Sequence, residues 1–313
     1  MMVPTVSGRR QGDAINGWII IDKPVGKTSA QVVNRVRRFL NARKAGHAGT
    51  LDPLASGILP IAFGEATKTI PFAMDTLKEY KFEISWGQKR DTDDREGCIV
   101  ERSDFRPDME QIERALPYFI GDIDQVPPNY SAIKVNGRRA YDLARNNAID
   151  ALPSRKVFVK TFKLESIIDQ DHASFLVTSG KGTYVRALAR DLAVRLGTVG
   201  HVSSLRRLKV GSFSEKDAIS LDSFEALAHS PATFDSLLPV EVALDGIPAM
   251  PLSGEQASRM KNGHSIPLDG NSNWGCKVEL GEGSLLYTIS FGKPIAISRV
   301  QEGYIRPIRV LNL

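Results

Sequence analysis

The chain has 313 residues and a net charge of +5, with 41 Lys and Arg against 36 Asp and Glu. Its 42% apolar and 25% charged residues are typical of a folded protein of about two domains, and its two cysteines exclude a disulfide scaffold and a four-cysteine zinc site. No apolar run approaches the roughly 18 residues of a membrane span, and residues 1–17 lack the apolar core of a secretory signal, so we expect a cytoplasmic protein.

A flexible polar arm over residues 1–16 precedes the predicted elements of the first half of the chain. Apolar runs, alternation and helical spacing predict where the strands, helices and loops lie. In order, they are a buried strand at 18–21, a helix at 30–41 capped by Thr28 or Ser29, a tight glycine-rich loop within 46–64, a half-buried strand at 78–86, its hairpin partner at 98–102 and a helix at 108–120.

The second half begins with a long basic insertion over residues 125–150. A loop of that length in a compact domain is usually functional or disordered. Strands are predicted at 157–163 and 174–179, because β-branched and aromatic residues are frequent there. Apolar residues at helical spacing then predict a helix over 183–196, with Gly197 as its stop signal.

The end of the chain has a different character. Ser253 and Gln256 predict a capping box for a short helix that ends at Gly263. A small β-rich domain over 245–313 is therefore expected after a main domain over 17–244. Its predicted strands lie at 276–280, 284–291, 294–300 and 303–310.

Three patterns of cofactor and metal sites are incomplete. Residues 26–28 resemble the end of a P-loop, but Ile21 stands where that motif needs a glycine. Asp91, Asp93 and Asp94 resemble the start of a calcium loop, but its glycine and its final glutamate are missing, which favours a solvated acidic loop. The five histidines show no paired ligand spacing, so no metal site is expected.

One long motif carries a family resemblance. Residues 46–60 read GHAGTLDPLASGILP and resemble the signature of the TruB family of tRNA pseudouridine synthases. Further family motifs resemble residues 17–24 (GWIIIDKP), 125–145 (QVPPNYSAIKVNGRRAYDLAR), 180–192 (GKGTYVRALARDL) and 201–207 (HVSSLRR). The resemblance therefore covers residues 17–210, and it is weaker from there to the end of the chain.

The resemblance implies an α+β pseudouridine synthase fold, in which helices flank a mixed, mostly antiparallel sheet. It implies a catalytic domain over 17–244 that grips RNA with its 125–150 insertion, and a PUA-like RNA-binding domain over 245–313. The implied activity is the isomerisation of uridine-55 in the T loop of tRNA on a flipped-out nucleotide. The family needs no cofactor or metal, so the expected partner is the T-arm stem-loop, without an obligatory protein partner.

By the same resemblance, the catalytic residues are Asp52, Tyr80 and Arg186. Asp52 is implied to be the nucleophile or the carboxylate that activates the ribose, and the carbon that it attacks stays open. Arg186 is implied to pair with Asp52 and to favour its ionised form. Tyr80 is implied to stack on the flipped uracil and to take part in proton transfer, although its strand position also suits a core residue.

Other residues are implied to bind RNA or to support the catalytic loop. His47 would help to hold the flipped nucleotides, and Tyr184 and Leu205 would line the pocket. Lys23 and Pro24 would brace the loop that carries Asp52. The cations of the insertion that would grip the RNA are Lys134, Arg138, Arg139 and Arg145.

The basic charge is concentrated next to these motifs. Residues 23–44 carry +7, and residues 125–163 and 181–209 carry +6 each, so the three segments hold +19 and the rest of the chain holds −14. A charge run is usually only a solvated face. Three runs that each lie beside a family motif favour a shared phosphate-binding surface instead.

Three alternatives to a stand-alone tRNA enzyme remain. A guide-RNA-dependent relative should lack the 125–150 insertion, and a non-catalytic RNA-binding or RNA-folding protein should not need both Asp52 and Arg186. A glycosidase-type hydrolase needs a second carboxylate at about 5–10 Å, which the motif around Asp52 does not supply.

Overall fold

The computed structural model describes residues 12–131, 133–135, 138–139, 152–227, 230–268 and 280–313. Most of the predicted arm over 1–16, most of the predicted strand at 276–280, and Arg145 lie outside the described residues. Side chains are not described for the residues of β8 (Lys134–Val135) and β9 (Arg138–Arg139).

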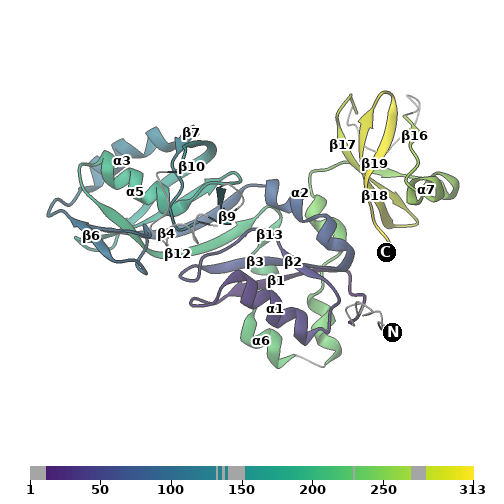
Figure 1. Ribbon diagram of the computed structural model, residues 1–313, viewed down its shortest axis with the longest axis horizontal. Coiled ribbons are helices and arrows are strands. Elements are labelled where there is room, and N and C mark those ends of the chain that lie inside the picture. Colours follow the sequence, from purple (N-terminus) through teal and green to yellow (C-terminus); the bar gives the residue numbers. More distant parts are fainter. Residues whose placement is uncertain (1–11, 132, 136–137, 140–151, 228–229, 269–279) are drawn as a thin grey trace, which may run out of the picture.

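A large sheet forms the centre of the molecule, and helices and short 3-10 segments surround it (Figure 1). Its strands are β1 (Gly17–Lys23), β2 (Ala45–His47), β3 (Ser56–Phe63), β4 (Lys78–Trp86), β7 (Gly121–Gln125), β10 (Arg155–Ile167), β11 (His172–Ser179), β12 (Gly200–Val210), β13 (Phe213–Ser214) and β14 (Ala218–Ser220). The helical segments are α1 (Ser29–Phe39), η1 (Gly64–Lys68), α2 (Ile70–Asp75), α3 (Met109–Ala115), η2 (Leu116–Phe119), α5 (Val185–Arg195), η3 (Glu215–Asp217), α6 (Leu221–Ala226), η4 (Pro231–Ser236) and η5 (Val240–Leu244).

The strand order along the large sheet is β14-β1-β3-β12-β4-β11-β10-β7, with β2 beside β3 and β13 beside β12. The pairs β1–β14 and β3–β12 are parallel, and the other pairs are antiparallel. This arrangement confirms the predicted α+β class with a mixed, mostly antiparallel sheet. β12 lies in the middle of the sheet, between β3 and β4. It therefore connects the part that contains β14, β1 and β3 with the part that contains β4, β11, β10 and β7.

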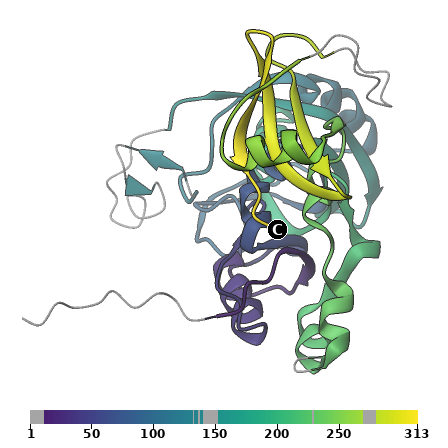
Figure 2. The same cartoon turned by 90° about the vertical axis from the view of Figure 1, so that its right-hand side faces the viewer.

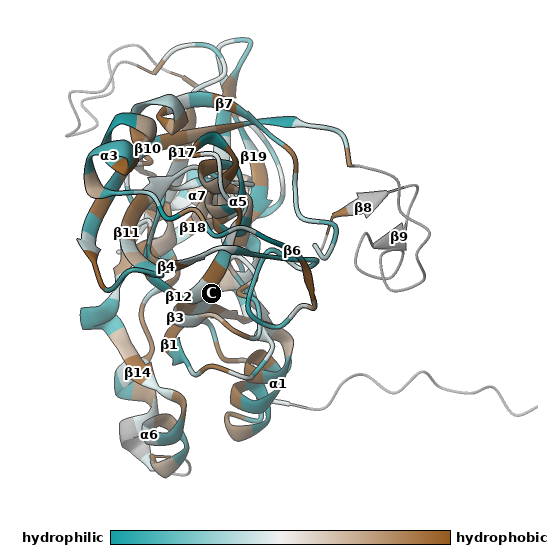
Figure 3. Ribbon diagram, turned by 90° about the vertical axis from the view of Figure 1, so that its left-hand side faces the viewer, coloured by the Kyte–Doolittle hydropathy of each residue, from teal (hydrophilic) through white to brown (hydrophobic). Residues whose placement is uncertain are grey.

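Helices cover the two ends of the sheet separately. α5 packs on β12 and β4, and α3 packs on β10, whereas α6 contacts β1 and β14 and also contacts α1. α1 starts at a capping box between Thr28 and Gln31, and it buries Val32 and Val36 while Arg38 stays exposed. Figure 3 shows both hydropathy colours along α1, as expected for a helix with one apolar and one basic side.

An aromatic cluster fills the core under α5. Phe82 stacks on Phe175 at 5.5 Å between ring centroids, Phe162 lies within 5.8 Å of both rings, and Trp86 meets Phe175 edge-on at 6.2 Å. These residues come from the three neighbouring strands β4, β10 and β11. The alternation predicted for 78–86 is confirmed, because Phe82, Ile84 and Trp86 are buried.

Two short hairpins lie off the large sheet. β5 (Gln88–Arg90) pairs with β6 (Ile99–Arg102), so the strand predicted at 98–102 does form a hairpin. Its predicted partner is wrong, because the strand at 78–86 pairs with β11 and β12 instead. The loop between β5 and β6 corrects part of another prediction, because Asp93 and Asp94 are only 7% and 3% exposed, whereas Asp91 is exposed as expected. The reason is that arginines on α5 pair with the two buried carboxylates. The β8–β9 hairpin lies apart from the large sheet (Figures 2 and 3).

A second sheet with its own core lies near the end of the chain and is yellow in Figure 1. Its order is β15-β17-β18-β19-β16, and α7 packs against it. Its elements are β15 (Ala249–Pro251), α7 (Gly254–Lys261), β16 (Ile266–Pro267), β17 (Leu285–Ser290), β18 (Lys293–Gln301) and β19 (Tyr304–Val310). The capping box predicted between Ser253 and Gln256 is confirmed at the start of α7.

The chain end attaches this second sheet to the main body. Leu311 is 1% exposed and belongs to the core cluster that contains Trp18. The Lys68 ammonium donates to the Val310 carbonyl at 2.8 Å, and the Asn312 amide donates to the Glu65 carboxylate at 2.8 Å. Within the described ranges, no helix is both long and apolar enough to cross a membrane.

Candidate active site

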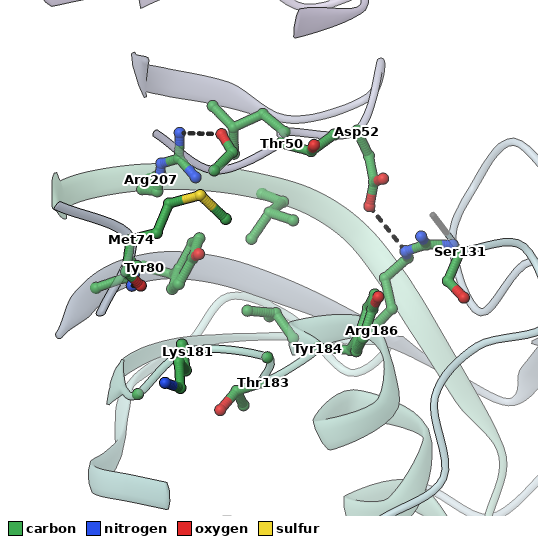
Figure 4. A pocket seen from close by; sticks show the side chains of 17 residues that line it. Thr50, Asp52, Met74, Tyr80, Ser131, Lys181, Thr183, Tyr184, Arg186 and Arg207 are labelled. Carbon is green, nitrogen blue, oxygen red and sulfur yellow. Dashed lines mark hydrogen bonds and ion pairs between the residues drawn. The ribbon is translucent and has the colours of Figure 1, made fainter. Parts of the chain in front are cut away.

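A cavity of about 260 Å³ lies between the loop after β2, the start of β4 and the N-terminus of α5. Figure 4 shows side chains from these elements that face one another across it. The site residues predicted at this position are all present, namely Asp52, Tyr80, Tyr184, Arg186 and Leu205. The other lining residues are Gly49, Thr50, Leu51, Met74, Lys78, Ser131, Gly180, Lys181, Gly182, Thr183, Val185 and Arg207.

Asp52 and Arg186 form an ion pair at this cavity. Arg186 Nε lies 2.9 Å from Asp52 Oδ2, and the Arg186 side chain is only 4% exposed (Figure 4). The same guanidinium lies 3.2 Å from Asp94 Oδ2 and donates to the carbonyls of Thr92 and Tyr130 at 2.8 and 3.0 Å. Arg186 therefore neutralises two carboxylates and is held in a single orientation by main-chain oxygens.

The ionisation of Asp52 is set by opposing effects. Burial raises the pKa of Asp52 above its ordinary value, whereas the Arg186 guanidinium lowers it, the Asp94 carboxylate raises it further, and the Lys23 ammonium lowers it. Because the carboxylate keeps about a third of its exposure, a molecule in the cavity can still reach it.

The loop around Asp52 is fixed by hydrogen bonds on both sides. The Ser29 hydroxyl accepts from the Leu51 amide at 2.8 Å and donates to the Leu51 carbonyl at 3.0 Å. The Lys23 ammonium donates to the carbonyls of Pro24, Lys27 and Pro53. Lys23 is fully buried, and burial lowers its pKa to about 8. Lys23 therefore links the turn at Pro24 and Lys27 to the loop that carries Asp52, and the supporting role predicted for Lys23 and Pro24 stays a prediction.

Tyr80 and Leu205 line the cavity from the neighbouring strands β4 and β12. Tyr80 is half-buried on β4 and also packs against the core, so both interpretations given to it from the sequence fit its position. Leu205 lies on β12 and is 6% exposed. Tyr184 is the N-cap residue of α5, and burial raises the pKa of its phenol.

His47 lies at the end of β2, before the cavity-lining loop, and is not a lining residue itself. Burial lowers the pKa of His47, and the charge of Arg207 lowers it further, which favours the neutral imidazole. Lys134, Arg138 and Arg139 lie on the β8–β9 hairpin with undescribed side chains. Their predicted RNA contacts, like that of Arg145, stay predictions.

Arg207 is a site residue that sequence reasoning missed. It is 1% exposed, it lines the cavity, and it lies opposite Tyr80 in the register of β12 and β4. Its Nε donates to the Ile58 carbonyl at 2.7 Å and a terminal nitrogen donates to the Gly49 carbonyl at 3.1 Å. The sequence signal that could identify Arg207 is the alternation of side chains along a strand. Its neighbour Arg206 points to the opposite face, where it bonds to the Asp22 carboxylate.

Asp93 and Asp94 were also missed as parts of the site. Asp94 pairs with Arg186, and Asp93 pairs with Arg190 one helical turn later, at 2.8 Å. The available signal is the four-residue spacing of the two arginines on a predicted helix, which places both on one face. Because Asp94 does not line the cavity, it cannot serve as the second carboxylate of a glycosidase.

The arrangement suits nucleophilic or electrostatic work by a single carboxylate. It offers an accessible carboxylate, a guanidinium that favours its charge, and an aromatic ring on which a flat group could stack. No group of three or more metal-ligating side chains is found in the part of the chain that the structure describes.

Comparisons with known proteins place this chain among related sequences and folds. The model of the TruB family pseudouridylate synthase N-terminal domain matches residues 37–185. The model of the tRNA pseudouridylate synthase B C-terminal domain matches residues 186–245. Together they cover residues 37–245, which include every strand of the large sheet except β1 and all the lining residues of the cavity.

Curated relatives match along nearly the whole chain. A tRNA pseudouridine synthase B of Rhodospirillum rubrum is 51% identical over 98% of this chain and 100% of its own length. A protein of the same name from Caulobacter vibrioides is 51% identical over 97% and 99%.

Solved structures share the fold at lower identity. A chain of an H/ACA RNP bound to a substrate RNA containing 2'-deoxyuridine has a TM-score of 0.74 at 20% identity, covering 98% of this chain and 92% of its own. A chain of a Cbf5-Nop10-Gar1 complex has a TM-score of 0.71 at 23% identity, covering 97% and 85%.

Proposed function

Because the chain belongs to the TruB family of pseudouridylate synthases, we propose that it isomerises uridine-55 in the T loop of tRNA to pseudouridine, with Asp52 as the nucleophile. One observation carries the assignment of Asp52: its carboxylate pairs with buried Arg186 and still opens onto a cavity lined by Tyr80. The relatives that match the whole chain are named for tRNA, which supports the substrate class.

The reaction is an isomerisation, so no atom is gained or lost overall. The target uridine leaves the RNA loop, and its base enters the cavity to stack on Tyr80. The Asp52 carboxylate attacks the nucleotide, the N-glycosidic bond breaks, and the uracil rotates. C5 then bonds to the ribose carbon that N1 left, and the bond between Asp52 and the nucleotide breaks, which frees the carboxylate. The C5 proton is lost and N1, the ring nitrogen released from the ribose, gains one, so N3 keeps its own proton. Since this route is redox-neutral, it requires no oxidant or reductant.

The remaining site residues divide into RNA contacts and supports. Tyr184 and Leu205 close the cavity around the base, and His47 holds nucleotides beside the loop that carries Asp52. Lys23 and Pro24 keep that loop in place from below. The cations that grip the T arm through the insertion are Lys134, Arg138, Arg139 and Arg145. The PUA-like domain over 245–313 adds a second RNA-binding surface, and no partner protein is needed.

The test follows tritium released from C5 of uridine in a T-arm stem-loop, with no other RNA or protein present. Wild type and the exposed control Asp104→Asn should release tritium at similar rates. Asp52→Asn should bind the stem-loop but release none, because the amide is a poor nucleophile. Full release by Asp52→Asn would contradict the nucleophile assignment. Free uracil in the wild-type reaction would indicate a hydrolase, and a need for added guide RNA would contradict a stand-alone enzyme.

A further inference from the structure

The start of the insertion, residues 125–131, is bonded to the first half of α5 at three successive points. The Gln125 amide oxygen accepts from the Tyr184 amide at 2.8 Å, and the Gln125 amide nitrogen donates to the Tyr184 carbonyl at 3.2 Å. Arg190 donates to the Val126 carbonyl at 2.7 Å, and Arg186 donates to the Tyr130 carbonyl at 3.0 Å. The segment therefore lies along the helix that carries Arg186.

Gln125 holds the N-cap residue of α5 from outside the helix. Tyr184 is that N-cap residue, and its own side chain makes no capping bond. The Gln125 side chain, on a residue that is 1% exposed, bonds to both main-chain groups of Tyr184, whose carbonyl also accepts from the Leu188 amide at 3.1 Å. A buried amide that is doubly bonded in this way fixes the first turn of α5, where Arg186 lies.

Arg190 joins the same segment to the acidic loop. It lies 2.8 Å from Asp93 Oδ2 and 2.9 Å from Asp191 Oδ1, in addition to its bond to Val126. Asp93 is buried and adopts a left-handed backbone conformation with φ 59°, which a non-glycine residue keeps only where its surroundings hold it. The neighbours of Asp93, Thr92 and Asp94, both bond to Arg186.

We propose that Gln125 and Arg190 are positioning residues, which hold the segment 125–131 and the acidic loop on α5 so that Arg186 keeps its orientation toward Asp52. This role rests on the proposed function of the same site. Neither residue lines the cavity, so neither is expected to touch the reacting base. Three partners of Arg186, namely Thr92, Asp94 and Tyr130, belong to the two segments that Gln125 and Arg190 fix.

The experiment compares Gln125→Met and Arg190→Met with wild type at saturating T-arm stem-loop under single-turnover conditions. Each should slow pseudouridine formation by about tenfold or more, because small misplacements of catalytic groups are costly. The dissociation constant for the stem-loop should stay within about threefold. The matched control is Arg114→Met, since Arg114 is an exposed arginine on α3 that lies outside the three basic segments and does not line the cavity.

Two readouts separate positioning from general loss of structure. In Arg190→Met, the acidic limb of the rate profile should move to higher pH, because a displaced guanidinium opposes protonation of Asp52 less. Asp93→Asn should share the defect, and the double variant of Asp93 and Arg190 should be no slower than Arg190→Met alone, since both changes break one bond. Arg190→Lys should restore part of the rate by pairing with Asp93.

Several outcomes would overturn the proposal. If wild type is active and the rates of Gln125→Met and Arg190→Met lie within about twofold of its rate, the positioning role is refuted and the proposed function is not. The positioning role is also refuted if the variants lose only RNA affinity, or if Arg190→Met is slow but the acidic limb of its pH–rate profile does not move. If Arg190→Met does not fold, Gln125→Met and Arg190→Lys decide by the same criteria. An inactive wild type would instead refute the proposed function, and the positioning role with it.

Discussion

Arg186 is the residue on which the chemistry of Asp52 depends. Burial works against a charged carboxylate, and Asp94 adds a second negative charge beside it. The Arg186 guanidinium counters both effects from 2.9 Å, and its own bonds to two carbonyls prevent it from turning toward solvent. The ion pair therefore favours the ionised form of the half-buried carboxylate that we propose as the nucleophile, rather than being a source of stability in itself.

Replacing Arg186 should raise the pKa of Asp52. Burial already raises this pKa, and the guanidinium opposes that shift, so Arg186→Met leaves only the Lys23 ammonium to oppose it. The carboxyl ¹³C resonance of Asp52 should then titrate at higher pH in Arg186→Met than in wild type, with Arg186→Lys between them. The Arg114→Met control should titrate like wild type, and an unchanged midpoint in Arg186→Met would contradict this account.

The sequence predicts the site residues whose roles the family resemblance implies, and it misses those that long-range pairing brings to the site. Asp52 and Arg186 are 134 positions apart, yet each is predicted because a local motif surrounds it. Asp94 looks like a solvated loop residue until α5 brings Arg186 within 3.2 Å of it. Arg207 is similar, because its cavity position depends on how β12 pairs with both β3 and β4.

At the scale of elements, the parallel contact between β3 and β12 requires a glycine. Gly57 faces Arg207 in the register, with φ +101°, and a Cβ atom there would lie 2.1 Å from the Arg207 carbonyl oxygen. Both the backbone conformation and the close approach exclude a side chain. This contact fixes the strand that carries Leu205 and Arg207 beside the loop that carries Asp52.

Gly57→Ala should be far more destabilising than Gly197→Ala, although both glycines have a positive φ. Gly197 has φ +78° after α5 with open space around its Cβ position, so Gly197→Ala should cost only the left-handed penalty of about 1–2 kcal/mol. Gly57→Ala adds the clash with β12. Urea denaturation followed by circular dichroism should give a much lower midpoint for Gly57→Ala, and equal midpoints would contradict the close approach.

Element types were predictable, whereas their pairing was not. The predicted strand at 78–86 matches β4, and the helices predicted at 30–41 and 183–196 match α1 and α5 to within a few residues. These elements have clear alternation or helical spacing, which local sequence records. The order of the large sheet places β12 between β3 and β4, and no local pattern specifies such a distant pairing.

At the scale of the whole molecule, much of the basic charge is already neutralised within the protein. Of the segment 181–209, Arg186 and Arg190 pair with the acidic loop, Arg206 pairs with Asp22 and Glu215, and Arg207 is buried. The segment 23–44 is different, because it keeps exposed cations on and after α1. The sequence-based charge map therefore overestimates the third segment, and α1 becomes the better candidate for phosphate contacts outside the cavity.

Two arginines on α1 provide a matched test of that surface. Arg35 forms an ion pair with Glu225 on α6, whereas the exposed Arg38 has no acidic partner among the described residues. If phosphates bind here, Arg38→Gln should lower the slope of log Kd for tRNA against log salt by about 0.7–0.9, the value for one phosphate contact. Arg35→Gln should change the slope less, because its charge is already compensated, and filter binding over a range of KCl concentrations measures both. Equal slopes in the two variants and wild type would move the phosphate contacts away from α1.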